Sequence, residues 1–416
     1  MPVTRHLPAA LILLSIAGLA SENFSHFPVG TMCLLGLYWA WRDYAGVVRS
    51  REARLLLGVF ACVWVPMLLA LPDAVNPARA MKTTFLYVHF LPAGLYVIYM
   101  LRDHVVRRIV WIGLALIIAF WCIDGMIQLV AGKDLFGYPY DGSVLKGVFY
   151  PKQRFGLILA VFAPLYLSVV HRLAARSWWA WLLLLPLLVG IVFSLKRTAW
   201  VMLLAALGAY LACFVRPRRT DLRLAIGASG VATAALVLAI VFVPNLRTQV
   251  TGTFNLFSTD FERVDIATSR RLSLWHTGLG MVRAHWLNGI GPRGFRTVYR
   301  EFAGPDDFWI KLGTSGQTHP HLMVLEVLIE TGVIGLIAYI LLLIILTREM
   351  WRQRLDDPRA ATYLMIALVA WFPLNAHLAF YGSYWSTLVW IVIALGCAGS
   401  DNERGVRSQQ HPTAQL

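Results

Sequence analysis

The feature that most constrains this chain is a succession of long apolar runs. An α-helix rises about 1.5 Å per residue, so crossing a hydrocarbon core of roughly 30 Å takes about 20 apolar residues. Only 14% of the 416 residues are charged, well below the share in a soluble globular domain. We therefore predict an all-α polytopic membrane protein with about twelve transmembrane helices. The predicted spans are residues 7–24, 27–42, 55–73, 84–101, 109–130, 156–171, 177–195, 198–215, 224–243, 319–347, 361–378 and 382–399.

Arginine and lysine are divided unevenly between the two alternating sets of short loops. Of the 37 cations, 20 lie on one side and eight lie in the short loops of the other side. Cytoplasmic loops carry the excess of Lys and Arg, so an even number of spans predicts that both termini are cytoplasmic. The net charge of +15 is spread over many loops, so we predict no nucleic-acid partner.

The longest connection, residues 244–318, is predicted to lie on the outer side. It contains three tryptophans and several phenylalanines, too much aromatic surface for a disordered linker. An apolar stripe at steps of three and four predicts a helix that ends before Gly289 and rests on the bundle or at the lipid interface. The stripe consists of Leu272, Trp275, Leu279, Val282 and Trp286. Nine cations against six acids in this connection indicate an anionic ligand.

The predicted division of the chain follows from this loop. Residues 1–243 form helices one to nine, 244–318 a helical periplasmic loop domain, 319–399 the last three helices and 400–416 a cytoplasmic tail.

Two outer segments place cations where predicted spans begin. "FSLKRTAW", residues 193–200, interrupts a long apolar stretch, so the chain must turn at Lys196 and Arg197. "YPKQRFG", residues 150–156, supplies Lys152 and Arg154. Cations at such depth mark substrate paths, but they also snorkel to phospholipid head groups, and both interpretations stay open.

A third segment, "SRRLSLWHTGL", places Arg271 four residues before Trp275, on the same helix face. An arginine there can direct two N–H donors at one phosphate. The alternative is an ordinary solvated cation on an amphipathic helix.

Two histidines, His319 and His321, stand directly before the tenth predicted span. Their spacing does not suit a zinc pair on one helical face, and no outer Cys/His cluster completes a metal site, so no metal or other cofactor is predicted. The positive end of the helix favours a neutral imidazole, which is what a general base needs. An interfacial histidine without a chemical role is the alternative.

Several of these segments resemble motifs of the O-antigen ligase and polymerase superfamily. "HLMVLEVLIETGVIGL" resembles its signature, in which a histidine opens a span and an acid and two glycines follow; these are His321, Glu326, Gly332 and Gly335. "SLKRTAW" resembles its Ser-Arg motif and carries Arg197. "RLSLW" followed by "LNGIGPRGF" resembles its loop motif and carries Arg271.

The resemblance implies a GT-C-like glycosyltransferase of the bacterial inner membrane, with its active site on the periplasmic face. It implies an undecaprenyl diphosphate-linked glycan as donor and a lipid A-core hydroxyl as acceptor, within the membrane lipids. Arg197 and Arg271 would hold the diphosphate, with Lys196, Lys152 and Arg154 as weaker candidates. His321 would be the base of an inverting, metal-independent transfer, and His319 and Glu326 would line the acceptor cleft.

Other functions fit the same sequence. An O-antigen polymerase, or a transferase that moves an oligosaccharide to protein, would share the donor and differ in the acceptor. A transporter of polyprenyl-linked glycans is the more distant alternative, because such a protein needs ionisable residues in several spans and internal repeats, and neither pattern occurs.

Overall fold

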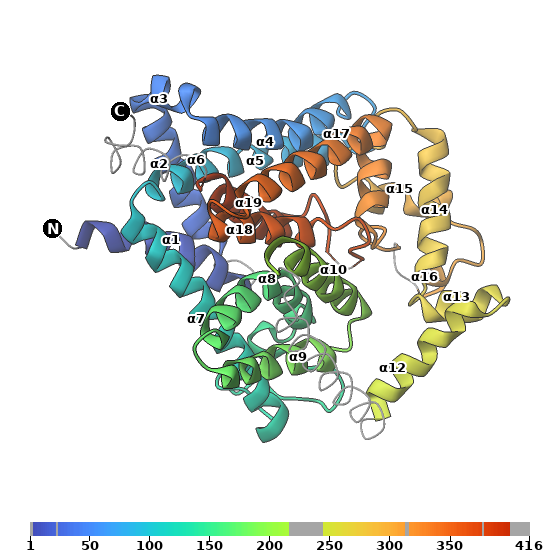
Figure 1. Cartoon of the computed structure of the whole chain (residues 1–416). Coiled ribbons are helices and arrows are strands. Elements are labelled where there is room, and N and C mark those ends of the chain that lie inside the picture. Colours follow the sequence, from blue (N-terminus) through green and yellow to red (C-terminus); the bar gives the residue numbers. More distant parts are fainter. Residues whose placement is uncertain (1–2, 22–23, 216–243, 313–315, 377, 400–416) are drawn as a thin grey trace, which may run out of the picture.

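The computed structural model describes residues 3–21, 24–215, 244–312, 316–376 and 378–399. The regular secondary structure in these ranges is helical. Within these ranges no β-strand forms (Figure 1). The first part of the chain contains α1 (Val3–Ala17), α2 (His26–Arg42), α3 (Tyr44–Arg49), α4 (Arg51–Leu69), α5 (Pro77–Tyr87), α6 (Phe90–Met100), α7 (His104–Ala131), α8 (Phe155–Ala174), α9 (Leu184–Phe193) and α10 (Arg197–Phe214). The second part contains α12 (Pro244–Phe254), α13 (Phe261–Ala267), α14 (Arg271–Ala284), α15 (Phe295–Phe302), α16 (Phe308–Lys311), α17 (Met323–Gln353), α18 (Pro358–Ala370) and α19 (Ser383–Cys397).

Six helical segments are long and apolar enough to cross a membrane, which supports a polytopic membrane protein. They are Arg51–Leu69, Pro77–Met100, His104–Ala131, Phe155–Ala174, Arg197–Phe214 and Met323–Gln353. Four shorter apolar helices accompany them: His6–Ala20, Trp178–Phe193, Pro358–Ala370 and Ser383–Cys397. The predicted count of twelve is therefore not confirmed, and the predicted span 224–243 lies outside the described residues.

One predicted span is too long. Residues 361–378 were expected to form a single helix, but α18 ends at Ala370. Pro373 accounts for the end, because a proline cannot donate to a helix and disfavours the helical conformation of the residue before it. The chain then folds back, and the carbonyls of Pro373 and Asn375 accept the first amides of α17, from Val324 (3.2 Å) and Met323 (2.9 Å).

Helices α8, α18 and α19 form the most completely buried part of the molecule, because most of their residues are inaccessible. Their fully buried large side chains include Phe155, Trp385 and Trp390. Apolar residues all around a helix are expected where protein, and not lipid, surrounds it. Helices α12, α13 and α14 lie away from this part, along one edge of the molecule (Figure 1).

The helix predicted in the long connection is confirmed as α14, and its predicted stripe is divided: Trp275 and Val282 pack against a buried cluster, whereas other members of the stripe do not. Leu279 and Trp286 are exposed, whereas Leu274 and Met281 are buried. Gly278 explains the choice, because a Cβ at this position would stand 2.6 Å from Cδ1 of Ile329. Gly278 thus lets α17 approach α14 closely beside the buried Leu274 and Met281, and Leu279 points outward.

Helix α17 is broken inside the predicted membrane span. Gly332 adopts φ 65° and ψ −164°, and a Cβ there would overlap the carbonyl of Leu287. Residues 286–291 run alongside the break and bond its backbone: Val333 N donates to Trp286 O (2.9 Å), and Gly291 N donates to Glu330 O (3.0 Å). Such a break is tolerated at membrane depth because the protein satisfies the freed backbone groups.

Candidate active site

The turn predicted at Lys196 and Arg197 is confirmed. Helix α9 ends at Phe193, and α10 begins at Arg197. The sequence offers no glycine or proline here, and Leu195 takes the left-handed conformation instead, with φ 52°. This conformation is uncommon for a residue with a branched side chain, so the tertiary structure must hold it in place.

Arg197 meets the segment that leads into α14. Its Nη2 donates to Oγ of Ser269 (3.3 Å), two residues before Arg271. Ser269 and Arg270 both have positive φ, at 63° and 60°. Buried Asp265 stabilises this bend by accepting from both the amide (3.2 Å) and the hydroxyl (2.7 Å) of Ser273. The bend therefore brings the starts of α10 and α14 together.

The electrostatics of the cluster agree with this geometry. Burial, together with the nearby charge of Arg197, lowers the pKa of Arg271 to about 10. Burial also lowers the pKa of Lys196, with added contributions from the charges of Arg271 and Lys146. Lys196, Arg197 and Arg271 are thus three mutually repelling cations, and none of them forms a salt bridge with an acid in the part of the chain that the structure describes.

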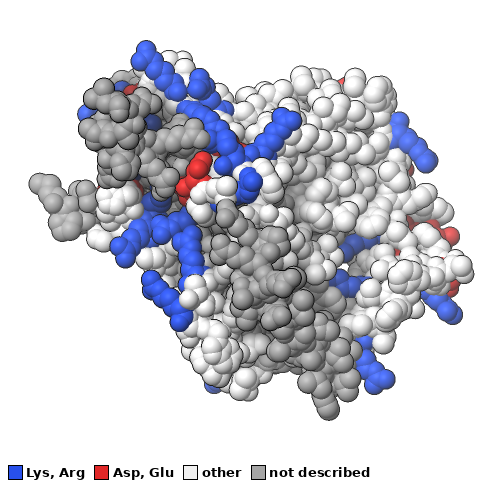
Figure 2. Space-filling model, in the orientation of Figure 1, with Lys and Arg blue, Asp and Glu red and all other residues white. Residues whose placement is uncertain are grey.

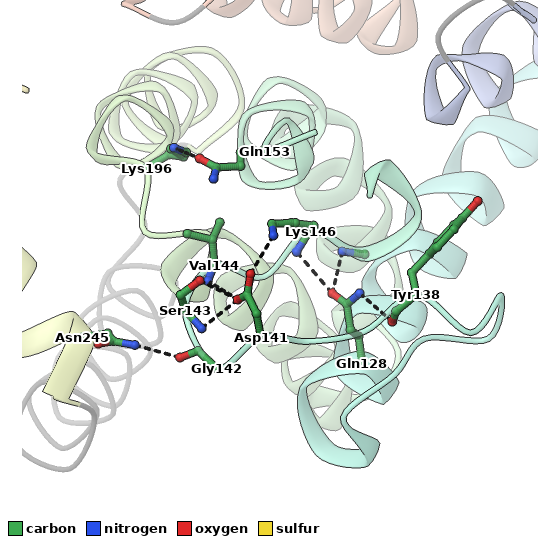
Figure 3. Close-up of polar contacts among 11 residues, drawn as sticks. Gln128, Tyr138, Asp141, Gly142, Ser143, Val144, Lys146, Gln153, Lys196 and Asn245 are labelled. Atoms are coloured by element: carbon green, nitrogen blue, oxygen red, sulfur yellow. Dashed lines mark hydrogen bonds and ion pairs between the residues drawn. The ribbon is translucent and has the colours of Figure 1, made fainter. Parts of the chain in front are cut away.

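A neighbouring loop contacts Lys196 (Figure 3). The ammonium of Lys196 donates to Oε1 of Gln153. In the same loop region Lys146 pairs with Asp141 at 2.8 Å, and the hydrogen bonds from Lys146 and Ser143 hold the pKa of Asp141 well below its usual range. The segment "YPKQRFG" therefore does reach the cluster, but it does so through Gln153, which the sequence analysis did not single out.

The other two candidates from that segment are placed differently. Arg154 packs its guanidinium over the ring of Tyr384, 3.9 Å from the centroid. Lys152 is exposed. The assignment of Lys152 and Arg154 to the diphosphate remains a prediction.

The two histidines lie side by side before α17. Their ring centroids are 4.0 Å apart, and Thr318 Oγ1 and His319 Nδ1 are hydrogen bonded at 2.9 Å. His319 is 9% exposed and His321 half-buried, with φ 52°. Trp275 Nε1 donates to Pro320 O (3.1 Å), so the residue between the histidines is tied to α14 one turn after Arg271.

Below the histidines, two carboxylates are buried on α17. Glu326 is 1% and Glu330 0% exposed, one helical turn apart. Oε2 of Glu330 accepts the backbone amide of Arg293 at 2.6 Å. Glu326 is therefore inside the protein and not at its surface. Its place in an acceptor cleft stays a prediction.

Two arginines near these carboxylates were not among the predicted site residues. Arg293 has φ 63°, and its Nη1 and the Nε of Arg296 are buried without a hydrogen-bond partner among the described residues. Burial lowers the pKa of Arg296, as do the charges of Arg293 and Arg79. The segment "GPRGF" was the signal in the sequence, because it places Arg293 in a turn between Pro292 and Gly294. At a position with positive φ an arginine is less favourable than a glycine.

Within the described ranges, no three His, Cys, Asp or Glu side chains form a group that could hold a metal ion. The five cysteines are free.

A comparison with protein families matches the part of the chain that contains the cationic cluster and the histidine pair. A family model described as O-Antigen ligase matches residues 180–340. The match includes the turn at Lys196, the start of α14 and the histidine pair, and it begins after Lys152 and Arg154. A search of curated proteins found no match.

Proposed function

We propose that this chain is an O-antigen ligase of the O-antigen ligase and polymerase superfamily, because residues 180–340 match the family model described as O-Antigen ligase. Such an enzyme moves a glycan from undecaprenyl diphosphate to a sugar hydroxyl of lipid A-core. The observation that carries the proposal is the cluster of Lys196, Arg197 and Arg271, cations without an acidic partner among the described residues, which α14 connects to the histidine pair.

The cationic cluster suits a leaving diphosphate. In the transition state, negative charge grows on the oxygen that bridges the sugar and the phosphate. Fixed guanidinium groups in a partly desolvated site stabilise such charge more than water does. Arg197 and Arg271 can each direct paired donors to the diphosphate oxygens, and Lys196 adds a less directional charge.

His321 is proposed as the base. Its ring nitrogen takes the proton of the acceptor hydroxyl while the acceptor oxygen bonds to the anomeric carbon. The bond from that carbon to the diphosphate oxygen breaks, and the electron pair leaves with the diphosphate. A single displacement of this kind inverts the anomeric configuration. His319 and Glu326 are proposed to help shape the acceptor cleft.

The topology is part of the proposal. The cluster and the histidines lie at the starts of α10 and α17 and at the end of α9, so they share one end of the predicted bundle. The distribution of Lys and Arg assigns that end to the periplasmic face of the bacterial inner membrane, with both termini in the cytoplasm.

The test is transfer by the purified full-length protein in detergent. Lipid-linked glycan is supplied together with lipid A-core, with unfinished glycan on the same lipid carrier, or with an acceptor protein. Product on lipid A-core supports the ligase. Exclusive elongation of the lipid-linked glycan would make the protein a polymerase, and product on protein an oligosaccharyltransferase. Absence of transfer to every acceptor, together with glycan movement in sealed vesicles, would favour a transporter.

The same assay tests the expected independence from metals. Transfer should persist in EDTA, because the arginines carry the leaving-group charge. A strict requirement for an added divalent ion would contradict the proposed chemistry.

A further inference from the structure

A cavity of about 670 Å³ lies at the end of the molecule where α3 is found. The start of α4, the end of α6 and the residue after α19 complete its walls. Four of its lining residues are arginines: Arg49, Arg51, Arg54 and Arg102. Its size falls in the range of small-molecule binding sites, roughly 300 to 1,000 Å³.

This cavity is separate from the proposed active site. Arg51 in its wall forms two hydrogen bonds with Glu349, at 3.2 and 2.7 Å. Glu349 belongs to the last turns of α17, whereas His321 precedes the first turn. The unbroken part of the helix, from Gly332 to Glu349, alone rises roughly 26 Å, close to the thickness of a hydrocarbon core. The two sites therefore lie at opposite faces of the predicted bundle.

The arginines exceed the acids in the cavity wall. The wall contains four arginines and one acid, Glu52, for a formal balance of 4 − 1 = +3. Glu52 accepts the hydroxyl of Ser50 at 2.6 Å, and Arg51 is already paired with Glu349. Arg49 and Arg54 are exposed and form no salt bridge with an acid among the described residues. The charges of Arg49 and Arg54 are therefore the ones in the cavity wall that an external anion can pair with.

The surroundings of the cavity indicate a lipid. Next to it, Trp41 is 80% and Tyr44 71% exposed, as in the aromatic belts at membrane interfaces. Farther along α2 and α4, Leu34 (70%) and Leu57 (52%) also point outward. Figure 2 shows Lys and Arg side chains gathered over α3 and the beginning of α4. Arginines at head-group depth above an apolar surface match a molecule with a phosphate head and acyl chains.

We propose that this arginine cavity is a binding site for an anionic phospholipid, with its phosphodiester between Arg49 and Arg54 and its acyl chains along α2 and α4. A headgroup that carries an ammonium would add another positive charge to a cavity that the arginines already make positive. The site should therefore prefer phosphatidylglycerol or cardiolipin to phosphatidylcholine.

The experiment measures lipid binding to the purified full-length protein in detergent by native mass spectrometry. Phosphatidylglycerol should bind about tenfold more tightly than phosphatidylcholine, given the usual contribution of basic residues near anionic lipid. The double substitution Arg49→Gln/Arg54→Gln should abolish this preference. Arg49→Lys/Arg54→Lys should retain most of it, because charge is kept.

The matched control is Arg108→Gln/Arg348→Gln. Both residues are exposed, and they lie at the same end of the molecule, in the first turn of α7 and near the end of α17, but outside the cavity wall. An equal loss of preference in this control would mean that bulk positive charge and not the cavity attracts lipid, which would overturn the proposal. A second arm measures thermal stabilisation by inorganic pyrophosphate in the absence of lipid. Stabilisation equal to that by phosphatidylglycerol would overturn the lipid assignment in favour of a free anion.

Discussion

The two ends of α17 use arginine in different ways. At the C-terminal end, Glu349 binds Arg51 (2.7 Å) and Arg352 (2.5 Å), and Asp357 binds Arg107 (3.3 Å). At the N-terminal end, Lys196, Arg197 and Arg271 come together without an acid in the described part of the chain. Paired charges hold helices together, whereas clustered like charges lower stability and persist where an anionic ligand compensates them.

A third arrangement lies between these two. Arg293 and Arg296 stand near Glu326 and Glu330, and the backbone amide of Arg293, not its guanidinium, donates a hydrogen bond to Glu330. The carboxylate of Glu330 thus fixes the turn that bears the arginine. Arg293 and Arg296 form no salt bridge with these acids among the described residues, but they have carboxylates nearby, unlike the cluster at Arg271.

The largest expected effect is at the histidine. His321→Ala should reduce the turnover number about 10² to 10⁴-fold, because a positioned base contributes that much. Thermal stability and donor binding should stay near wild type. The matched control is His276→Ala, an exposed histidine on α14. Unchanged turnover in His321→Ala would remove this residue from the chemistry.

The next effect separates function from stability in the cationic cluster. Arg271→Gln should lower the turnover number about 10² to 10³-fold, as loss of a charge-stabilising donor does. Because burial and Arg197 depress the pKa of Arg271, its charged form opposes folding, so the variant should melt no lower than wild type. Arg271→Lys should restore activity only in part. Arg283→Gln, exposed on the same helix, serves as the control.

The opposite end should show the reverse pattern. Glu349→Gln leaves Arg51 and Arg352 without their acid, and both side chains are about a third exposed, at 36% and 32%. We expect a loss of about 1 to 2 kcal/mol in stability, less than for a fully buried pair. Turnover per folded molecule should not change. A melting temperature equal to wild type would show that these pairs are not structural.

The smallest effect is on pH dependence. The pKa of Lys196 is lowered by burial and by the charges of Arg271 and Lys146, so Lys196 loses its proton at a lower pH than an ordinary lysine. The value of kcat/KM for the donor should therefore fall as the pH rises into the alkaline range and Lys196 loses its proton. Over the same range the folded state binds fewer protons than the unfolded chain, so stability should rise with pH.

The variant Lys196→Gln tests the assignment. It should lower kcat/KM at neutral pH and remove the first part of the alkaline decline. An alkaline profile identical to that of wild type would assign the decline to other groups.

The sequence by itself determined the features that depend on neighbouring residues. Apolar length predicted the membrane helices, the cations at Lys196 and Arg197 predicted the turn, and the periodicity before Gly289 predicted α14. A helix, a turn and a span are decided over 10 to 20 residues, where hydrophobic length and charge act locally.

The tertiary structure alone decided which segments meet. It selected the buried face of α14 through Gly278, opened α17 at Gly332 for residues 286–291, and ended α18 at Ala370. It also joined Ser269 to Arg197, 72 positions apart in the chain. Close packing and backbone hydrogen bonding between distant segments govern these features, and a pattern of neighbouring residues does not contain that information.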